Sequence, residues 1–309
     1  MPEACLVTKK IQMKGPIRGK LLFWISKIAA SILAPGLHTM EGLQAAIRKN
    51  RAKGPALPPK SMLKNYNINE TNTGDMRVFS IERRERSDSS NVLLYFHGGA
   101  MVLDLQPIQW NLIKGMVDHI DAKIFIPIFQ LAPEAIWRET MPQILHFYLE
   151  VVQKYGAHNV ILVGDSSGGC LAMLLAQMLR DKNNPLPAAL VLYSPVLDLT
   201  ATGEDQPALE KRDPSVSISL IRNAASLWAP DVRHDDPRVS PLYGEQSGLP
   251  PTIIFTGDRE VLESDGLRLK AINPEVDHRS YAEMPHVFPA SGLAEGNHAL
   301  KESAAFIKS

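Results

Sequence analysis

Residues 159–179 read NVILVGDSSGGCLAMLLAQML, which is an apolar run, a glycine-rich hexapeptide and a second, longer apolar run. The first run has the length of a buried strand, and the second is long enough for a helix. Where a strand turns sharply into a helix, the central residue of the turn has a strained backbone conformation. The residues on either side of it must be small, because the turn packs tightly. The stretch therefore predicts a turn that exposes the hydroxyl of Ser166, with an ordinary glycine-rich turn between strand and helix as the alternative.

Strand-length apolar runs alternate with helix-length segments on both sides of this turn. Continuous apolar strands separated by helices indicate a mostly parallel sheet that is covered on both faces. The predicted fold class is therefore α/β, with a mostly parallel central sheet and helices on both faces. The runs lie at residues 92–96, 123–128, 160–163, 189–193 and 252–255.

The chain divides at residues 53–60, KGPALPPK, where three prolines and a glycine stop any helix. We expect an N-terminal helical cap region at 1–60 and a catalytic domain at 61–309. A charged, proline-rich insertion at about 199–243 separates the fourth apolar run from the fifth and carries a helical pattern near 217–228. Excursions at the carboxyl ends of parallel strands border ligand sites, so we expect the insertion and the N-terminal helices to cap a pocket.

The composition excludes several function classes. Lys and Arg together number 33, as do Asp and Glu, so no net charge attracts nucleic acid or an anionic membrane. Cys5 and Cys170 are too few for a disulfide framework and lack the spacing of a zinc site, which indicates a reducing compartment. With 309 residues and 45% apolar content, the chain is long enough for one large domain with a smaller cap.

Residues 21–34, LLFWISKIAASILA, resemble the apolar core of a signal peptide. However, Lys27 interrupts the segment, which is also shorter than the roughly 20 apolar residues of a membrane span. We expect a helix packed on the protein and a cytoplasmic location. Membrane association through residues 21–34 is the open alternative, and the oligomeric state, a homodimer included, is open as well.

The strand at 92–96 is followed by His97-Gly98-Gly99-Ala100. Glycines let the backbone approach a substrate closely and direct its N–H groups inward. The N–H groups of Gly98, Gly99 or Ala100, together with that of Ser167, are predicted to form an oxyanion hole. A tight turn at the end of the strand is the alternative.

A serine hydroxyl becomes a good nucleophile only beside a base that accepts its proton, so the chemistry requires a histidine at the same edge of the sheet. Of nine histidines, His286 lies in a proline-flanked loop, after a predicted strand and ahead of the final helix. We expect His286 to be the base, with His278 and His298 as the alternatives.

A carboxylate that orients the imidazole should lie between the serine and the histidine in chain order. The segment after the strand at 252–255 reads GDREVLESD and offers four carboxylates. Spacing alone does not choose among them. They belong to Asp258, Glu260, Glu263 and Asp265.

From about residue 91 to the C-terminus, the chain resembles the hormone-sensitive-lipase-like branch of the α/β hydrolases, a family of carboxylesterases. In that family the acid is usually an Asp whose register here falls on Glu260, which leaves Asp258 as the alternative. Ala100 replaces the usual third glycine and keeps its N–H group. The motifs are HGGA at 97–100, LAPE at 131–134, GDSSGG at 164–169, YSP at 193–195 with Asp198, SPL at 240–242 and MPHVF at 284–288.

The resemblance implies a serine hydrolase that cleaves small carboxylic esters, with short acyl or acetyl groups, through an acyl-enzyme on Ser166. This reaction needs no metal and no organic cofactor, and no nucleic-acid partner is expected. A non-catalytic small-molecule receptor and a non-hydrolytic lyase on the same fold are the alternatives. Such receptors typically lose the histidine and such lyases the serine, so the presence of Ser166 and His286 argues against both.

Overall fold

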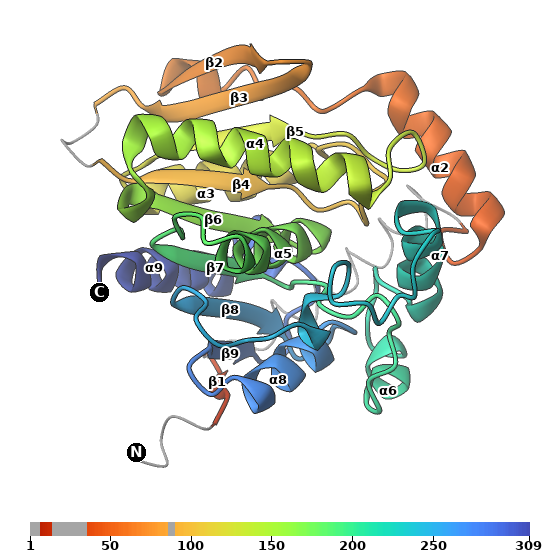
Figure 1. The fold of residues 1–309 in the computed structure, drawn as a ribbon. Helices are drawn as coiled ribbons and strands as arrows, with labels where there is room; N and C mark the ends of the chain where they lie inside the picture. The colour runs from red at the N-terminus through yellow and green to blue at the C-terminus, as the bar shows by residue number, and fades with distance from the viewer. Residues whose placement is uncertain (1–6, 14–35, 86–89) are drawn as a thin grey trace.

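The computed structural model describes residues 7–13, 36–85 and 90–309, so the segment at 21–34 lies outside the described residues. Within these ranges, nine strands form one sheet in the order β1-β9-β8-β7-β6-β4-β5-β3-β2 (Figure 1). None of the described helices combines the length and the hydropathy that crossing a bilayer requires.

The described strands are β1 (Lys9–Ile11), β2 (Tyr66–Thr73), β3 (Met76–Arg83), β4 (Val92–Phe96), β5 (Lys123–Ile128), β6 (Val160–Asp165), β7 (Ala189–Tyr193), β8 (Thr252–Gly257) and β9 (Asp277–Tyr281). The α-helices are α2 (Met40–Lys53), α3 (Gln109–His119), α4 (Trp137–Tyr155), α5 (Ser167–Asp181), α6 (Gln206–Glu210), α7 (Ile218–Trp228), α8 (Glu263–Ile272) and α9 (Ala294–Lys308).

The central strands β4, β6, β7 and β8 run parallel to one another, and every residue in them is buried. Burial on both faces explains why these strands are continuous apolar runs rather than alternating patterns. The five predicted apolar strands and the predicted strand ahead of His286 are all present, and the α/β class is confirmed.

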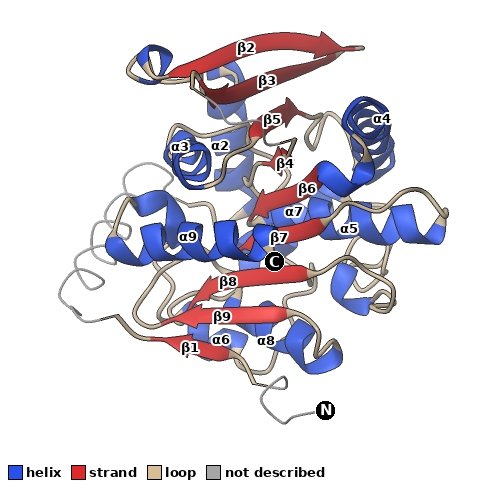
Figure 2. Ribbon diagram, turned by 90° about the vertical axis from the view of Figure 1, so that its left-hand side faces the viewer, coloured by secondary structure: helices blue, strands red, loops and turns tan. Residues whose placement is uncertain are grey.

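Helices cover both faces of the sheet (Figure 2). On one face, α3 and α9 pack on a buried cluster that includes Tyr95 and Trp110. On the other, α4, α5 and α8 pack on a cluster that includes Phe96 and Tyr148. The alternation of Tyr95 and Phe96 follows from the two-residue period of a strand, which sends successive side chains to opposite faces.

The edges of the sheet differ from the sequence-based expectation. The hairpin of β2 and β3 and the short strand β1 were not predicted. β2 reads YNINETNT and exposes most of its side chains, so it has no apolar run. Its pairing with β3 turns at Gly74, whose φ of 54° is a conformation that glycine adopts readily.

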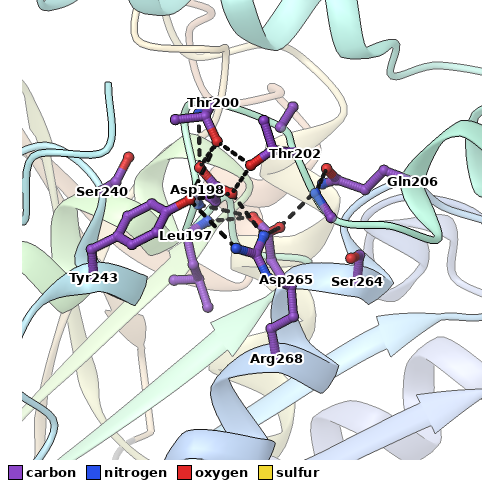
Figure 3. A network of polar contacts seen from close by, with 12 residues as sticks. Leu197, Asp198, Thr200, Thr202, Gln206, Ser240, Tyr243, Ser264, Asp265 and Arg268 are labelled. Atoms are coloured by element: carbon purple, nitrogen blue, oxygen red, sulfur yellow. Dashed lines mark hydrogen bonds and ion pairs between the residues drawn. The ribbon is translucent and has the colours of Figure 1, made fainter. Parts of the chain in front are cut away.

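A buried polar network fixes the base of the insertion against α8 (Figure 3). Asp198 Oδ2 lies 2.7 Å from Arg268 Nη1 and accepts a hydrogen bond from the Tyr243 hydroxyl at 3.1 Å. Asp265 Oδ2 accepts the backbone N–H of Leu197 at 2.7 Å. Because the side chains of Asp198 and Asp265 are both fully buried, these contacts replace the water that the two carboxylates lose.

The helix α2 lies against α7 of the insertion (Figure 1). The side chain of Asn223 in α7 donates to the carbonyl of His38 at 3.3 Å, just ahead of α2. At the other end of α2, Arg51 pairs with Asp104 at 3.1 Å and with Glu134 at 3.2 Å. These contacts join the two segments for which a cap was predicted. The division at residue 60 stays a prediction.

The network predicts a pH-dependent stability. Burial, together with the charge of Asp198, raises the pKa of Asp265 from 3.8 to about 7. Between these values the folded protein binds a proton that the unfolded chain has lost, so the free energy of unfolding falls as the pH rises from about 4 to about 7. In Asp265→Asn this pH-dependent part of the free energy of unfolding should disappear. The measurement is the difference between the free energies of urea unfolding at pH 5 and at pH 8.

The matched control is Asp235→Asn, which changes a partly exposed carboxylate of the insertion that pairs with Arg233. The pKa of Asp235 is lowered by this hydrogen bond, so its titration lies below pH 5 and the control should keep the wild-type difference. An equal pH dependence in Asp265→Asn and in the wild type would contradict the assignment.

Candidate active site

Ser166 lies at the turn between β6 and α5 with φ 52° and ψ −121°. Its N–H donates to the carbonyl of Tyr193 at 2.9 Å, and the residue is partly exposed between the buried Asp165 and Ser167. The turn packs so closely that a Cβ on Gly168 would lie 1.9 Å from the carbonyl oxygen of Phe96. The sequence around Ser166 therefore folds as the predicted strand, sharp turn and helix.

The loop after β4 lies directly beside this turn. A Cβ on Gly98 would come within 2.9 Å of the Cβ of Ser166, so only glycine allows the approach. In the described structure, the backbone N–H groups of Gly99, Ala100 and Ser167 have no hydrogen-bond acceptor. The N–H of Gly98 is occupied, because it donates to Asp165 Oδ1 at 2.9 Å. Of the four predicted oxyanion donors, three are therefore available and Gly98 is not.

Asp165 holds the turn and this loop together, a role that the sequence analysis missed. Its buried carboxylate accepts hydrogen bonds from the Tyr95 hydroxyl, the Gly98 N–H and the Gln109 side-chain amide, the last at 3.0 Å. Ser167 Oγ adds a second link by accepting the N–H of Met101 at 3.2 Å. The available signal was an acidic residue at the end of a fully buried strand.

His286 lies in the loop that follows β9. Its Nδ1 is 2.6 Å from Glu260 Oε2, and its side chain is 12% exposed while that of Glu260 is fully buried. Burial lowers the pKa of His286, but the hydrogen bond and charge of Glu260, with smaller contributions from Asp213 and Asp165, raise the pKa above its ordinary value overall. With Nδ1 bound to a carboxylate, Nε2 is left to exchange a proton with a reacting group.

Ser194 connects the Glu260 side chain to the histidine loop. Its hydroxyl donates to Glu260 Oε1 at 2.8 Å and accepts the N–H of Val287, the residue after His286, at 3.0 Å. Glu260 Oε1 also accepts the N–H of Gly257 at 2.7 Å, so Oε2 faces the imidazole. The YSP motif contained Ser194, but the sequence alone assigned it no role.

The alternative histidines lie in other surroundings. His278 is held between the hydroxyls of Thr8 at 3.0 Å and Thr256 at 2.8 Å, and burial lowers its pKa to about 4. His298 makes its hydrogen bond with the Tyr281 hydroxyl at 2.8 Å. Neither contacts a carboxylate of the segment after β8 in the part of the chain that the structure describes.

Among the four candidate carboxylates, Glu260 is the one that contacts His286 within the described residues. Asp258 Oδ1 accepts the N–H of Glu283 at 2.7 Å. Glu263 accepts the hydroxyl of Ser280 at 2.6 Å, and Asp265 belongs to the network at the base of the insertion.

Ser166, Glu260 and His286 follow β6, β8 and β9, so all three lie at the carboxyl edge of the sheet. No hydrogen bond joins Ser166 Oγ to His286 in the described structure. Hydrogen bonds of this kind are often long before a substrate binds. Across residues 7–13, 36–85 and 90–309, no group of three or more His, Cys, Asp or Glu side chains is arranged to hold a metal.

Comparisons with known proteins identify the family and the fold of the chain. A family model described as an alpha/beta hydrolase fold matches residues 93–290. An esterase from Acinetobacter venetianus is 30% identical over 198 residues, which span 63% of this chain and 65% of the relative, just under two thirds of its length. An acetyl-hydrolase from Streptomyces hygroscopicus is 31% identical over 237 residues, which span 73% of this chain and 78% of the relative.

Among solved structures, an esterase from the bacterial hormone-sensitive lipase (HSL) family superposes with a TM-score of 0.79 and 24% identity. The superposition covers 96% of this chain and 98% of the other. At this identity, the likeness shows the fold.

The pKa of His286 tests the contact with Glu260. Because the hydrogen bond and the charge of Glu260 raise this pKa against the effect of burial, Glu260→Gln should lower it. An NMR titration measures the pKa, with the resonance assigned by its absence in His286→Gln. Asp258→Asn serves as the control and should leave the value near that of the wild type. A lower pKa in the control than in Glu260→Gln would contradict the contact.

Removal of the Ser194 hydroxyl should destabilise the loop of His286. Ser194→Ala leaves a buried carboxylate with one donor fewer and the Val287 N–H without its acceptor, at a cost of about 1–3 kcal/mol in the free energy of unfolding. Hydrogen exchange at the Val287 amide should become faster. Ser280→Ala, which removes a hydroxyl from the buried Glu263, is the matched control and should leave Val287 exchange unchanged. Unchanged exchange in Ser194→Ala would refute this link.

Proposed function

We propose that this chain, which belongs to the α/β hydrolase fold family, is an esterase that hydrolyses small carboxylic esters with Ser166 as the nucleophile. Membership confirms the α/β-hydrolase family expected from the motifs. The observation that carries the proposal is the hydrogen bond of 2.6 Å between His286 and the buried Glu260, at the sheet edge that also holds the partly exposed Ser166.

In the proposed reaction, Ser166 Oγ attacks the ester carbonyl carbon while His286 Nε2 takes its proton. Glu260 fixes the tautomer through Nδ1 and stabilises the imidazolium. The tetrahedral intermediate expels the alcohol, which receives the proton from His286, and leaves an acyl-enzyme. Water, activated by the same imidazole, then releases the carboxylic acid and restores the Ser166 hydroxyl.

We infer that the oxyanion is held by the N–H groups of Gly99, Ala100 and Ser167, which have no other acceptor among the described residues. Gly98 is not proposed as a donor, because its N–H is bound to Asp165. Instead, the absence of a side chain at Gly98 allows the loop after β4 to lie beside Ser166. Ser167 is the first residue of α5, so the positive end of the helix dipole also favours the negative charge.

A short acyl group, acetyl in particular, is the proposed preference. The name of the Streptomyces relative, acetyl-hydrolase, supports it. The insertion and α2 are the proposed cap, because the contact between α2 and α7 brings the two predicted segments together. In this proposal, the inward face of the cap bounds the acyl and alcohol pockets, and side chains on its solvent-facing side do not line them.

The test is hydrolysis of nitrophenyl esters from acetate to palmitate by the wild type and by Ser166→Ala. The variant should lose about 100-fold or more in kcat/KM, because the nucleophile is gone while binding remains. Ser226→Ala, which changes an exposed serine of α7, is the control and should keep wild-type activity.

Among the esters, kcat/KM should be highest for acetate or butyrate and should fall with acyl length. Wild-type rates in Ser166→Ala would overturn the assignment of the nucleophile. A maximum at palmitate would overturn the proposed acyl preference and leave the nucleophile unaffected.

A further inference from the structure

Asp213 lies in the insertion, between α6 and α7, and reaches the segment that carries Glu260. Its Oδ2 accepts the backbone N–H of Val261, the residue after Glu260, at 2.9 Å. Its Oδ1 accepts the N–H groups of Ser215 at 2.8 Å and Val216 at 2.9 Å. Oδ1 also accepts the Ser215 hydroxyl at 3.1 Å, and all of its contacts are local and shape a turn ahead of α7. The contact of Oδ2 spans 48 residues, so a local turn does not account for it.

The charge of Asp213 also acts on His286. Three carboxylates raise the pKa of the imidazole: Glu260 after β8, Asp213 in the insertion and Asp165 at the end of β6. In the reverse direction, burial raises the pKa of Asp213 overall, and the nearby His286 opposes this rise. The cation next to Asp213 in sequence, Arg212, is 3.8 Å from Asp258. The carboxylates whose charges act on His286 therefore belong to three separate elements, and Glu260 is the one that contacts the imidazole.

We propose that Asp213 is a positioning residue that holds the insertion against the Glu260 segment and supports the imidazolium that forms on His286 during ester hydrolysis. The inference rests on the proposed function, because it assigns His286 as the base. Glu260 makes the direct contact with the imidazole, and Asp213 acts through Val261 and through its charge. An element of the cap is thereby coupled to the catalytic proton transfer.

The role follows from the change of charge along the reaction. His286 is neutral before attack and positive while the tetrahedral intermediate exists, so a fixed negative charge near it stabilises the later state more than the earlier one. The Asp213 carboxylate is already in place for this effect, because it accepts hydrogen bonds from the backbone N–H groups of Val261, Ser215 and Val216. Removal of the negative charge of Asp213 should therefore lower kcat more than it raises KM.

The test compares Asp213→Asn with Asp235→Asn, which removes a charge elsewhere in the insertion. With nitrophenyl acetate, Asp213→Asn should reduce kcat about tenfold, which corresponds to about 1.4 kcal/mol of transition-state stabilisation, with little change in KM. The acid limb of kcat/KM should move to lower pH, because His286 then loses its proton more easily. Asp235→Asn should match the wild type in both respects. Asp213→Glu, which keeps the charge, should restore the acid limb.

NMR titration of His286 gives a readout that needs no turnover. Its pKa should be lower in Asp213→Asn than in the wild type and in Asp235→Asn. If Asp213→Asn does not fold, Asp213→Ser is measured by the same criteria. An unchanged pKa of His286 in the neutral variant would overturn the proposal, as would an unchanged kcat. These outcomes differ from the one that would overturn the proposed function, which is full activity in Ser166→Ala.

Discussion

Glu260 is a carboxylate without access to water, and a buried charge of this kind is tolerated only where hydrogen bonds and a partner charge replace the solvent. Three groups meet that requirement: the hydroxyl of Ser194, the N–H of Gly257 and the imidazole of His286. They come from the ends of β7, β8 and β9, so the parallel sheet must be in register before the carboxylate is stabilised. The orientation of His286 depends on this condition, and so does the reaction proposed at Ser166.

The remaining polar contacts hold separate segments around that centre. Asp165 ties the loop of Gly98 to the turn of Ser166, and Asp198 and Asp265 fix the insertion against α8. Asp213 joins the insertion to the residue after Glu260. Arg51 joins α2 to Asp104, close to the loop of Gly99. The two segments of the proposed cap therefore contact the loops of the candidate active site through hydrogen bonds and ion pairs.

Much of the fold could be predicted because its information is local. The strands β4 to β8 follow from apolar runs in the sequence, and the small residues around Ser166 indicate a sharp turn within a few positions. The hairpin of β2 and β3 was missed because its solvated strand has a polar sequence. At the site, the choice of Glu260 required a family resemblance. Ser194, Asp165 and Asp213 make contacts with residues 48 to 93 positions away, which no spacing pattern reveals.

The most direct measurement of the central claim is the rate at which the organophosphate paraoxon modifies the protein, followed by intact-mass and peptide mass spectrometry. We expect one diethyl phosphoryl group on Ser166, which forms faster as the pH rises through the pKa of His286 and far more slowly in His286→Gln. Modification of another residue, or an equal rate in His286→Gln, would contradict it, because Ser166 would then not depend on the imidazole that Glu260 orients.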